Sequence, residues 1–161
     1  MNRIRRLVLS VSLTLLAGTA AAQTTAAPTP PSNRPDQLVK WRQSAYQVLA
    51  WNNARIKASL DGTYQREEVL RAAQAIAVLS QANIHSLFVP GTEKARGWKE
   101  TSAKAEAFSE PRFHQLGAEF TRDAQALAQT AAGGDVVAIR AAFNQLTKSC
   151  KACHDAYKAR D

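Results

Sequence analysis

Methionine is almost absent from this 161-residue chain, because Met1 is the only one. Cysteine is nearly as scarce, and the two cysteines stand close together near the C-terminal end. Beyond the first six residues there is also no run of lysine or arginine, although the formal net charge is +8. A nucleic-acid-binding surface usually shows clustered basic residues. The spread of charge therefore argues against that class and leaves a mildly cationic surface that can guide acidic protein partners.

Long hydrophobic runs are missing too, except near the N-terminus. The arginine-rich start MNRIRR is followed by the apolar run LVLSVSLTLLAGTA and by small residues at Ala20 and Ala22. This order is typical of a secretory signal peptide. An uncleaved membrane anchor is the alternative, but the run is shorter than the roughly 20 residues that a bilayer crossing needs. We therefore expect residues 1–22 to be a cleaved signal peptide, and a product exported to the periplasm of a Gram-negative host with no membrane span.

The next segment, residues 23–34, is rich in Thr, Pro and Ala and has no apolar periodicity. It is predicted to be a flexible spacer. In residues 35–161 alanine is frequent, β-branched runs are absent and glycine is confined to a few positions, which favours helix throughout. A stretch of this length predicts one domain with a single hydrophobic core.

Four amphipathic helices are predicted from apolar residues at spacings of three and four. They cover about residues 35–60, 64–84, 110–131 and 135–158. Asp61 and Gly62 suit a helix stop, as do Gly133 and Gly134, and Asp135 suits an N-cap. A long connection, residues 85–109, joins the second helix to the third and has room for a short helix. This pattern predicts an all-α fold, an antiparallel four-helix bundle.

Both cysteines belong to the stretch SCKACHDAYKARD, where Cys150 and Cys153 are followed directly by His154. A disulfide is the usual role of a cysteine pair in an exported protein, but one between residues three apart on a helix closes a very small ring. A thioredoxin-like redox pair opens a helix after a strand, whereas this pair lies deep within a helix. A zinc site needs four ligands, and the remaining histidines, His85 and His114, are not at ligand spacing. All three roles are disfavoured.

The pattern C-x-x-C-H is instead typical of covalent haem attachment. Residues three and four positions apart share one face of a helix, so both thiols and the imidazole of His154 project together. The thiols can then add to the haem vinyl groups while the imidazole reaches the iron. The leader supports this interpretation, because such thioether bonds form in the exported compartment. We predict one haem c, attached through Cys150 and Cys153, with His154 as an axial ligand of the iron.

Three stretches resemble the cytochrome c′ family, and the likeness spans about residues 35–160. They are KWRQSAY in the first predicted helix, FVPGTE after the second, and GGDVVAIRAAFNQLTKSCKACHDAYK at the last. The resemblance implies a four-helix bundle with five-coordinate haem iron, and a homodimer formed through the first two helices. The segment between PGTEK and Phe113 is longer than is usual in the family.

The second axial position of the iron has no obvious protein ligand. No methionine remains once the leader is removed, which excludes a Met/His cytochrome. By the resemblance, the first helix covers this distal face, with Tyr46 where an apolar residue is more familiar. Tyr46 is expected either to pack over the porphyrin or to contact the iron or its ligand. The resemblance also places Arg42 at a haem propionate, Lys158 in the proximal pocket, and His85 near the haem rim without a ligand role.

These features predict a haem protein that is not an enzyme and that transfers electrons, binds NO and CO, or does both. The expected partners are redox proteins and small gases. A haem peroxidase is one alternative, but it needs a distal acid–base group, and the first helix offers only Tyr46 and Arg42. A six-coordinate electron carrier with a sixth ligand other than methionine is another. A haem-free helical interaction module is the third.

Overall fold

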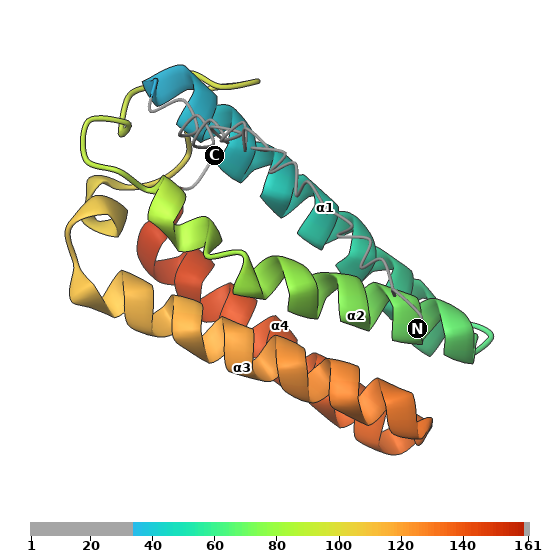
Figure 1. The fold of residues 1–161 in the computed structure, drawn as a ribbon. Coiled ribbons are helices and arrows are strands. Elements are labelled where there is room, and N and C mark those ends of the chain that lie inside the picture. Colours follow the sequence, from blue (N-terminus) through green and yellow to red (C-terminus); the bar gives the residue numbers. More distant parts are fainter. Residues whose placement is uncertain (1–33, 160–161) are drawn as a thin grey trace, which may run out of the picture. The chain divides into compact units, whose positions relative to one another are not determined.

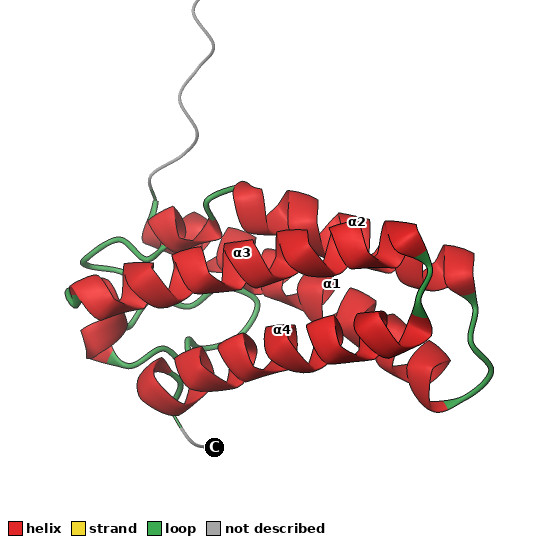
Figure 2. Ribbon diagram, turned by 90° about the horizontal axis from the view of Figure 1, so that it is seen from below, coloured by secondary structure: helices red, strands yellow, loops and turns green. Residues whose placement is uncertain are grey.

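The structure, a computed structural model, describes residues 34–159, and α-helices dominate this region. They are α1 (Pro35–Asp61), α2 (Arg66–Gln81), α3 (Pro111–Gly133) and α4 (Val136–Tyr157). Among residues 34–159 there are no β-strands, only two isolated bridges. Figures 1 and 2 show the four helices running up and down beside one another. The predicted all-α four-helix bundle is confirmed.

The ends of three helices follow the local sequence as predicted. α1 ends where the backbone N–H of Gly62 donates to the carbonyl of Ala58 at 3.0 Å. α3 ends at Gly134, whose φ of 78° is readily adopted only without a side chain. The carboxylate of Asp135 then caps α4 by accepting a hydrogen bond from the N–H of Val137 at 2.9 Å. These caps fix where α4 begins.

The second helix is shorter than its predicted span of residues 64–84. Asn83 adopts a left-handed backbone conformation with φ 52°, which asparagine tolerates better than most residues. This turn diverts the chain, and the 3₁₀ helix η1 (Ile84–Leu87) follows. The long connection also holds a short helix, as expected, the 3₁₀ helix η2 (Ala105–Phe108).

The helices pack in sequence, α1 against α2, α2 against α3, and α3 against α4. The core between them includes the fully buried Ile56, Val69, Leu127 and Ile139, and each such side chain stabilises the fold by about 1.5–3 kcal/mol. α1 and α4 are not a closely packed pair. At one end Arg140 joins them, since it donates a hydrogen bond to the carbonyl of Leu60 on α1.

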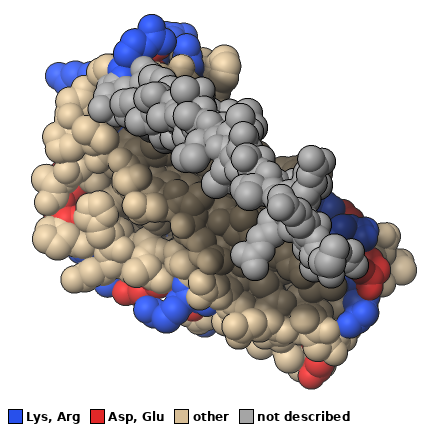
Figure 3. All heavy atoms as spheres, in the orientation of Figure 1, with Lys and Arg blue, Asp and Glu red and all other residues tan. Residues whose placement is uncertain are grey.

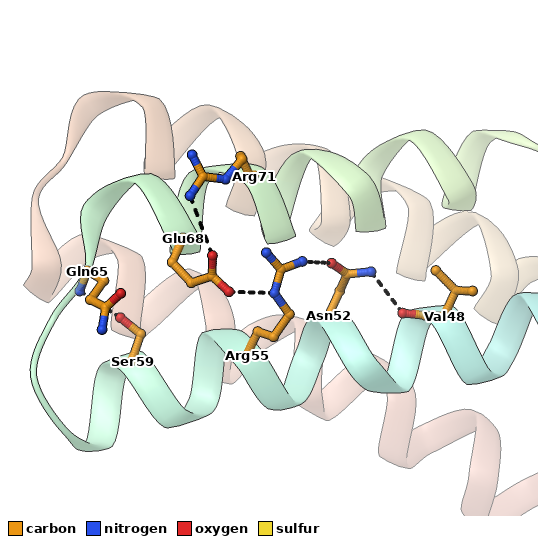
Figure 4. A network of polar contacts seen from close by, with 7 residues as sticks. All are labelled: Val48, Asn52, Arg55, Ser59, Gln65, Glu68 and Arg71. Carbon is orange, nitrogen blue, oxygen red and sulfur yellow. Dashed lines mark hydrogen bonds and ion pairs between the residues drawn. The ribbon is translucent and has the colours of Figure 1, made fainter.

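A polar network holds the second half of α1 to α2 (Figure 4). The amide nitrogen of Asn52, a residue only 1% exposed, donates to the carbonyl of Val48 at 2.9 Å. The amide oxygen of Asn52 accepts a hydrogen bond from Arg55 at 2.8 Å. Arg55 also pairs with Glu68 of α2 at 2.6 Å, and Arg71 lies 3.6 Å from the same carboxylate. Direct side-chain contacts therefore set the distance between α1 and α2.

The predicted signal peptide, residues 1–22, and all but the last residue of the predicted spacer lie outside the described residues. Within residues 34–159, no helix combines the length and the apolar character that a membrane crossing needs. On the part of the described surface that Figure 3 leaves uncovered, charged side chains gather towards the ends and edges. No continuous basic strip of the kind that nucleic-acid binding favours is visible on that uncovered part.

Candidate haem-binding site

A pocket with a volume of about 420 Å³ lies between α1 and α4, at the end where α1 begins and α4 ends. Sites for small molecules and cofactors usually enclose about 300–1,000 Å³. Many of the side chains that line the pocket are apolar, among them Leu49, Ile76, Phe88, Phe113, Leu116, Phe120 and Leu146. The two helices that are not closely packed are thus separated by a largely apolar pocket.

Three predicted site residues line this pocket from α4, namely Cys150, Cys153 and His154. Their spacing puts them on one face of the helix, which explains why all three reach the same pocket. Both cysteines are free thiols and partly buried, while His154 is exposed. The structure brings together two nucleophilic sulfur atoms and one imidazole on a single wall.

The pocket also affects how these side chains ionise. Burial raises the pKa of both Cys150 and Cys153, so the sulfur atoms remain protonated thiols at neutral pH. Burial lowers the pKa of His154, and the nearby ammonium of Lys158 lowers it further. The imidazole is therefore neutral at neutral pH, the state in which its nitrogen can bind a metal.

Tyr46 lines the pocket from α1. Its ring makes an edge-on contact with Phe88, with the ring centroids 6.3 Å apart. Burial raises the pKa of Tyr46 well above its ordinary value, and the sulfur of Cys153 adds to this effect. Within residues 34–159 the Tyr46 hydroxyl has no hydrogen-bond partner. A neutral phenol therefore lies in the α1 wall of the pocket.

Arg42 also borders the pocket from α1, but its guanidinium is directed into the α2–α3 connection. It is 3% exposed, and its two terminal nitrogens make four hydrogen bonds. The acceptors are the Leu87 carbonyl (3.3 Å), the Thr92 hydroxyl and carbonyl (2.9 and 3.3 Å) and the Thr101 hydroxyl (3.0 Å). The rings of Phe88 and Phe108 lie against the guanidinium, with their centroids 4.7 and 5.2 Å from its central carbon. A haem propionate bound to both terminal nitrogens of Arg42 would have to compete with these contacts. The role of Arg42 at a propionate therefore stays a prediction.

Lys158 and His85 complete the set of residues considered from the sequence, and both line the pocket. Lys158 follows α4 directly, and its backbone N–H donates to the carbonyl of His154 at 3.0 Å. The His85 ring lies 5.5 Å from that of Phe113. It also lies close to Gly117 of α3, where an added Cβ would be 2.7 Å from the imidazole. Gly117 therefore makes room for His85 in the pocket wall.

Residues 99–103 of the α2–α3 connection also line the pocket, although no local pattern in the sequence predicts this. Their polar sequence has no periodicity that indicates contact with a helix. The only available signal was the unusual length of the connection, which did not show where the chain goes. These residues lie next to the end of α4, where Ala103 pairs with Lys158 in an isolated antiparallel bridge.

The residues present fit a covalently attached haem. Two thiols and a neutral imidazole share one wall, as thioether attachment and axial ligation need. The aromatic and aliphatic side chains around them suit the apolar body of a porphyrin. The opposite wall includes Tyr46, which interacts electrostatically with both cysteines, whereas Arg42 is engaged in the connection.

Comparison with known proteins agrees with this site. The family model Cytochrome C′ matches residues 37–158, which include all four helices except the first two residues of α1. A cytochrome c′ from Rhodocyclus tenuis is 41% identical over 128 residues, covering 78% of this chain and 96% of that protein. A solved cytochrome c′ with an unusual ligand-controlled dimer dissociation is 34% identical, with a TM-score of 0.77 over 80% of this chain and 99% of the other. A ferrous variant of the cytochrome c′ from Alcaligenes xylosoxidans with bound NO is 31% identical, with a TM-score of 0.70 over 81% and 99%.

Proposed function

Because the chain belongs to the cytochrome c′ family and carries covalently attached haem c, we propose a function in electron transfer and gas binding. In this proposal the protein is a periplasmic electron carrier that also binds diatomic gases. The single observation that carries the proposal is the grouping of Cys150, Cys153 and His154 on one wall of a pocket. Cys150 and Cys153 would hold the haem through two thioether bonds, and His154 would bind its iron.

The opposite wall supports a five-coordinate iron. Once bound, the haem would supply a one-electron Fe(III)/Fe(II) couple and would be able to bind NO or CO. Tyr46 lies in this wall as a neutral phenol whose pKa is raised by burial. The NO complex of the Alcaligenes xylosoxidans relative supports gas binding in this chain.

Tyr46 and Arg42, the two α1 residues considered as distal groups, argue against an enzyme of the peroxidase type. General acid–base catalysis works best when the pKa of the group lies near the operating pH. The pKa of Tyr46 is raised far above this range, and the N–H groups on the terminal nitrogens of Arg42 are already engaged. We therefore assign electron transfer and gas binding rather than peroxide cleavage.

Optical spectra of the purified protein test the coordination state. We expect high-spin, five-coordinate haem in the ferric and ferrous states, and a six-coordinate spectrum after CO is added to the ferrous protein. A low-spin spectrum in the absence of added ligand would contradict the proposal and point to a sixth protein ligand. His85, the second imidazole that lines the pocket, is then the residue to replace first.

Tyr46 is assigned a packing role over the porphyrin. The Tyr46→Phe variant keeps the ring and removes only the hydroxyl, so we expect unchanged ferric bands and unchanged NO affinity. A shift in the ferric bands would show that the hydroxyl contacts the iron. A change in NO affinity alone would show that it contacts the bound ligand.

A homodimer through the outer faces of α1 and α2 is part of the proposal. Val48 and Trp51 on α1 are 42% and 61% exposed, and Val78 on α2 is 68% exposed. Exposed tryptophans often contribute most to an interface, and one cytochrome c′ relative shows ligand-controlled dimer dissociation. We expect Trp51→Lys to shift sedimentation equilibrium towards the monomer. Val137→Lys, a control at an 80% exposed position on α4, is expected to leave the dimer intact.

Export to the periplasm is proposed from the N-terminal sequence, which lies outside the described residues. Residues 1–22 are the signal peptide, residues 23–34 the spacer, and residues 35–161 the haem domain. N-terminal sequencing of protein from the periplasmic fraction should begin near Gln23. A chain that still begins at Met1 in the cytoplasmic fraction would contradict this part of the proposal.

A further inference from the structure

Part of the connection between α2 and α3 bridges the two helices that form the pocket walls. We call residues 97–104 the strap. Residues 99–103 line the pocket, and the two ends of the strap are bonded to α1 and to the end of α4. Figure 1 shows this connection, in yellow-green, at the end of the bundle where α1 begins and α4 ends.

Gln43 binds the strap to α1. Its amide oxygen accepts a hydrogen bond from the backbone N–H of Trp98 at 2.8 Å, and its amide nitrogen donates to the carbonyl of Lys99 at 2.9 Å. The indole N–H of Trp98 donates to the Ser44 hydroxyl at 2.9 Å. Gly97 lies so close that an added Cβ would be 2.5 Å from the Gln43 amide oxygen. The side chain of Gln43 therefore pairs with one backbone N–H and one backbone carbonyl of the strap, as the backbone of a neighbouring β-strand would.

Lys104 binds the other end of the strap to the end of α4. The backbone N–H of Lys104 donates to the carbonyl of Tyr157 at 2.9 Å, and the N–H of Ala159 donates to the carbonyl of Ser102 at 2.7 Å. The ammonium of Lys104 donates to the carbonyl of Ala156 at 2.8 Å. The last carbonyls of a helix have no partners within it, and positive charge is favoured at this end. Lys104 therefore stabilises the turn that follows His154.

The distance between these two attachments is limited by the chain itself. The carbonyl of Lys99 and that of Ser102 are separated by three residues, which span at most about 10 Å when fully extended. So short a segment can lengthen only up to this limit if α1 and α4 move apart. Beyond this limit, the strap would have to lose its bonds to α1, made by Arg42, Gln43 and Ser44, or its bonds to the end of α4, made by Lys104 and Ala159.

We propose that the strap is a brace that sets the distance between α1 and α4, with Gln43 and Lys104 as its positioning residues. Gln43 precedes Tyr46 by three residues on α1, and Lys104 binds the turn directly after His154 on α4. The brace therefore fixes the Tyr46 wall of the pocket relative to the His154 wall. This inference rests on the proposed haem site, because it assigns the two walls to the two sides of the iron.

A double-mutant cycle in the haem-loaded protein tests the brace. The variants are Gln43→Leu, Lys104→Met and the two combined, and the readout is the rate of CO association with the ferrous protein. Each single variant is expected to raise this rate about fivefold, the factor that one net hydrogen bond of about 1 kcal/mol represents. Each substitution weakens one end of the strap, and opening needs only one end to give way. The effects of the two ends should therefore add rather than multiply, and the double variant should fall well short of the product of the two single effects. An increase near the product of the two single effects would overturn the proposal.

Hydrogen–deuterium exchange provides a second readout that does not depend on gas binding. Gln43→Leu should speed exchange in residues 154–159, although these residues contact the opposite end of the strap. Lys104→Met should in turn speed exchange in residues 97–99. Faster exchange confined to the site of each substitution would show two independent local contacts and refute the brace.

Matched controls use the same substitutions on outer helix surfaces. Gln129→Leu on α3 and Lys148→Met on α4 alter exposed residues away from the strap, and both should behave as the wild type. Circular dichroism reports whether each variant folds, and a pyridine haemochrome assay reports its haem content. A wild-type protein without haem would refute the proposed function. Haem-loaded variants with multiplying effects on the CO rate would refute only the brace.

Discussion

The two halves of α1 are held in place by different means. The second half contacts α2 directly, through buried apolar side chains and the network of Asn52, Arg55 and Glu68 (Figure 4). The first half faces the pocket and α4 across it, and its polar side chains Arg42 and Gln43 bind the α2–α3 connection instead.

This difference shows how a bundle accommodates a cofactor between two of its helices. Close packing sets helix spacing where side chains interdigitate, but two helices that are separated by a pocket lack such contacts. In this chain a segment from elsewhere in the sequence supplies them, at the end of the bundle where α4 carries Cys150, Cys153 and His154.

The largest effect is expected when the first half of α1 loses its buried cation. Arg42→Met removes four hydrogen bonds and leaves the oxygens of Thr92 and Thr101 without their donor. We expect the free energy of unfolding to fall by about 2–4 kcal/mol, because hydrogen bonds to charged groups are worth more than neutral ones. Urea unfolding of the haem-loaded protein measures this loss.

Arg71→Met is the control for that experiment. Arg71 is an exposed arginine in the network at the other half, and surface ion pairs contribute about 1 kcal/mol or less. Equal losses for the two variants would contradict the assignment of Arg42 as the anchor of the connection.

A smaller effect is expected from the network at the second half of α1. Asn52→Ala removes the amide that bonds Val48 and Arg55, and we expect a loss of about 1–2 kcal/mol in the free energy of unfolding. The rate of CO association should stay at the wild-type value, because this network does not border the pocket. A faster rate would show that the two halves of α1 are not independent.

The smallest effect concerns the ion pair in the same network. The hydrogen bond from Arg55 holds the pKa of Glu68 below its ordinary value of 4.5. A carboxylate whose pKa is lower in the folded state stabilises the fold at pH values above its ordinary pKa. This contribution is lost as the pH falls through the pKa of the folded state. The free energy of unfolding should therefore fall less on acidification in Glu68→Gln than in the wild type. Urea unfolding of the wild type and of Glu68→Gln at neutral and acidic pH measures this difference. An equal loss of stability in the two proteins would show that the Arg55–Glu68 ion pair does not stabilise the fold.

Structural features that depend only on neighbouring residues were predictable from the sequence. Gly62, Gly134 and Asp135 cap helices as expected, because each acts on residues within a few positions of itself. The grouping of Cys150, Cys153 and His154 also follows from helical spacing alone. Such features need no knowledge of how distant segments meet.

Contacts between distant segments were not predictable in the same way. Gln43 and Lys104 are ordinary polar residues in the sequence, and their roles depend on how the connection folds back onto α1 and α4. The surroundings of Arg42 depend on the same path, since its acceptors lie 45 to 59 positions away. The end of α2 at Gln81 was missed because the left-handed turn at Asn83 interrupts an apolar pattern that continues beyond it.

The central claim is that the C-terminal turns of α4 hold the haem covalently. Its most direct test is the intact mass, under denaturing conditions, of protein produced in a host that matures c-type cytochromes. We predict the mass of the processed chain plus one haem, and the mass of the chain alone when Cys150 and Cys153 are both replaced by serine. A wild-type protein with the mass of the bare polypeptide would contradict the account.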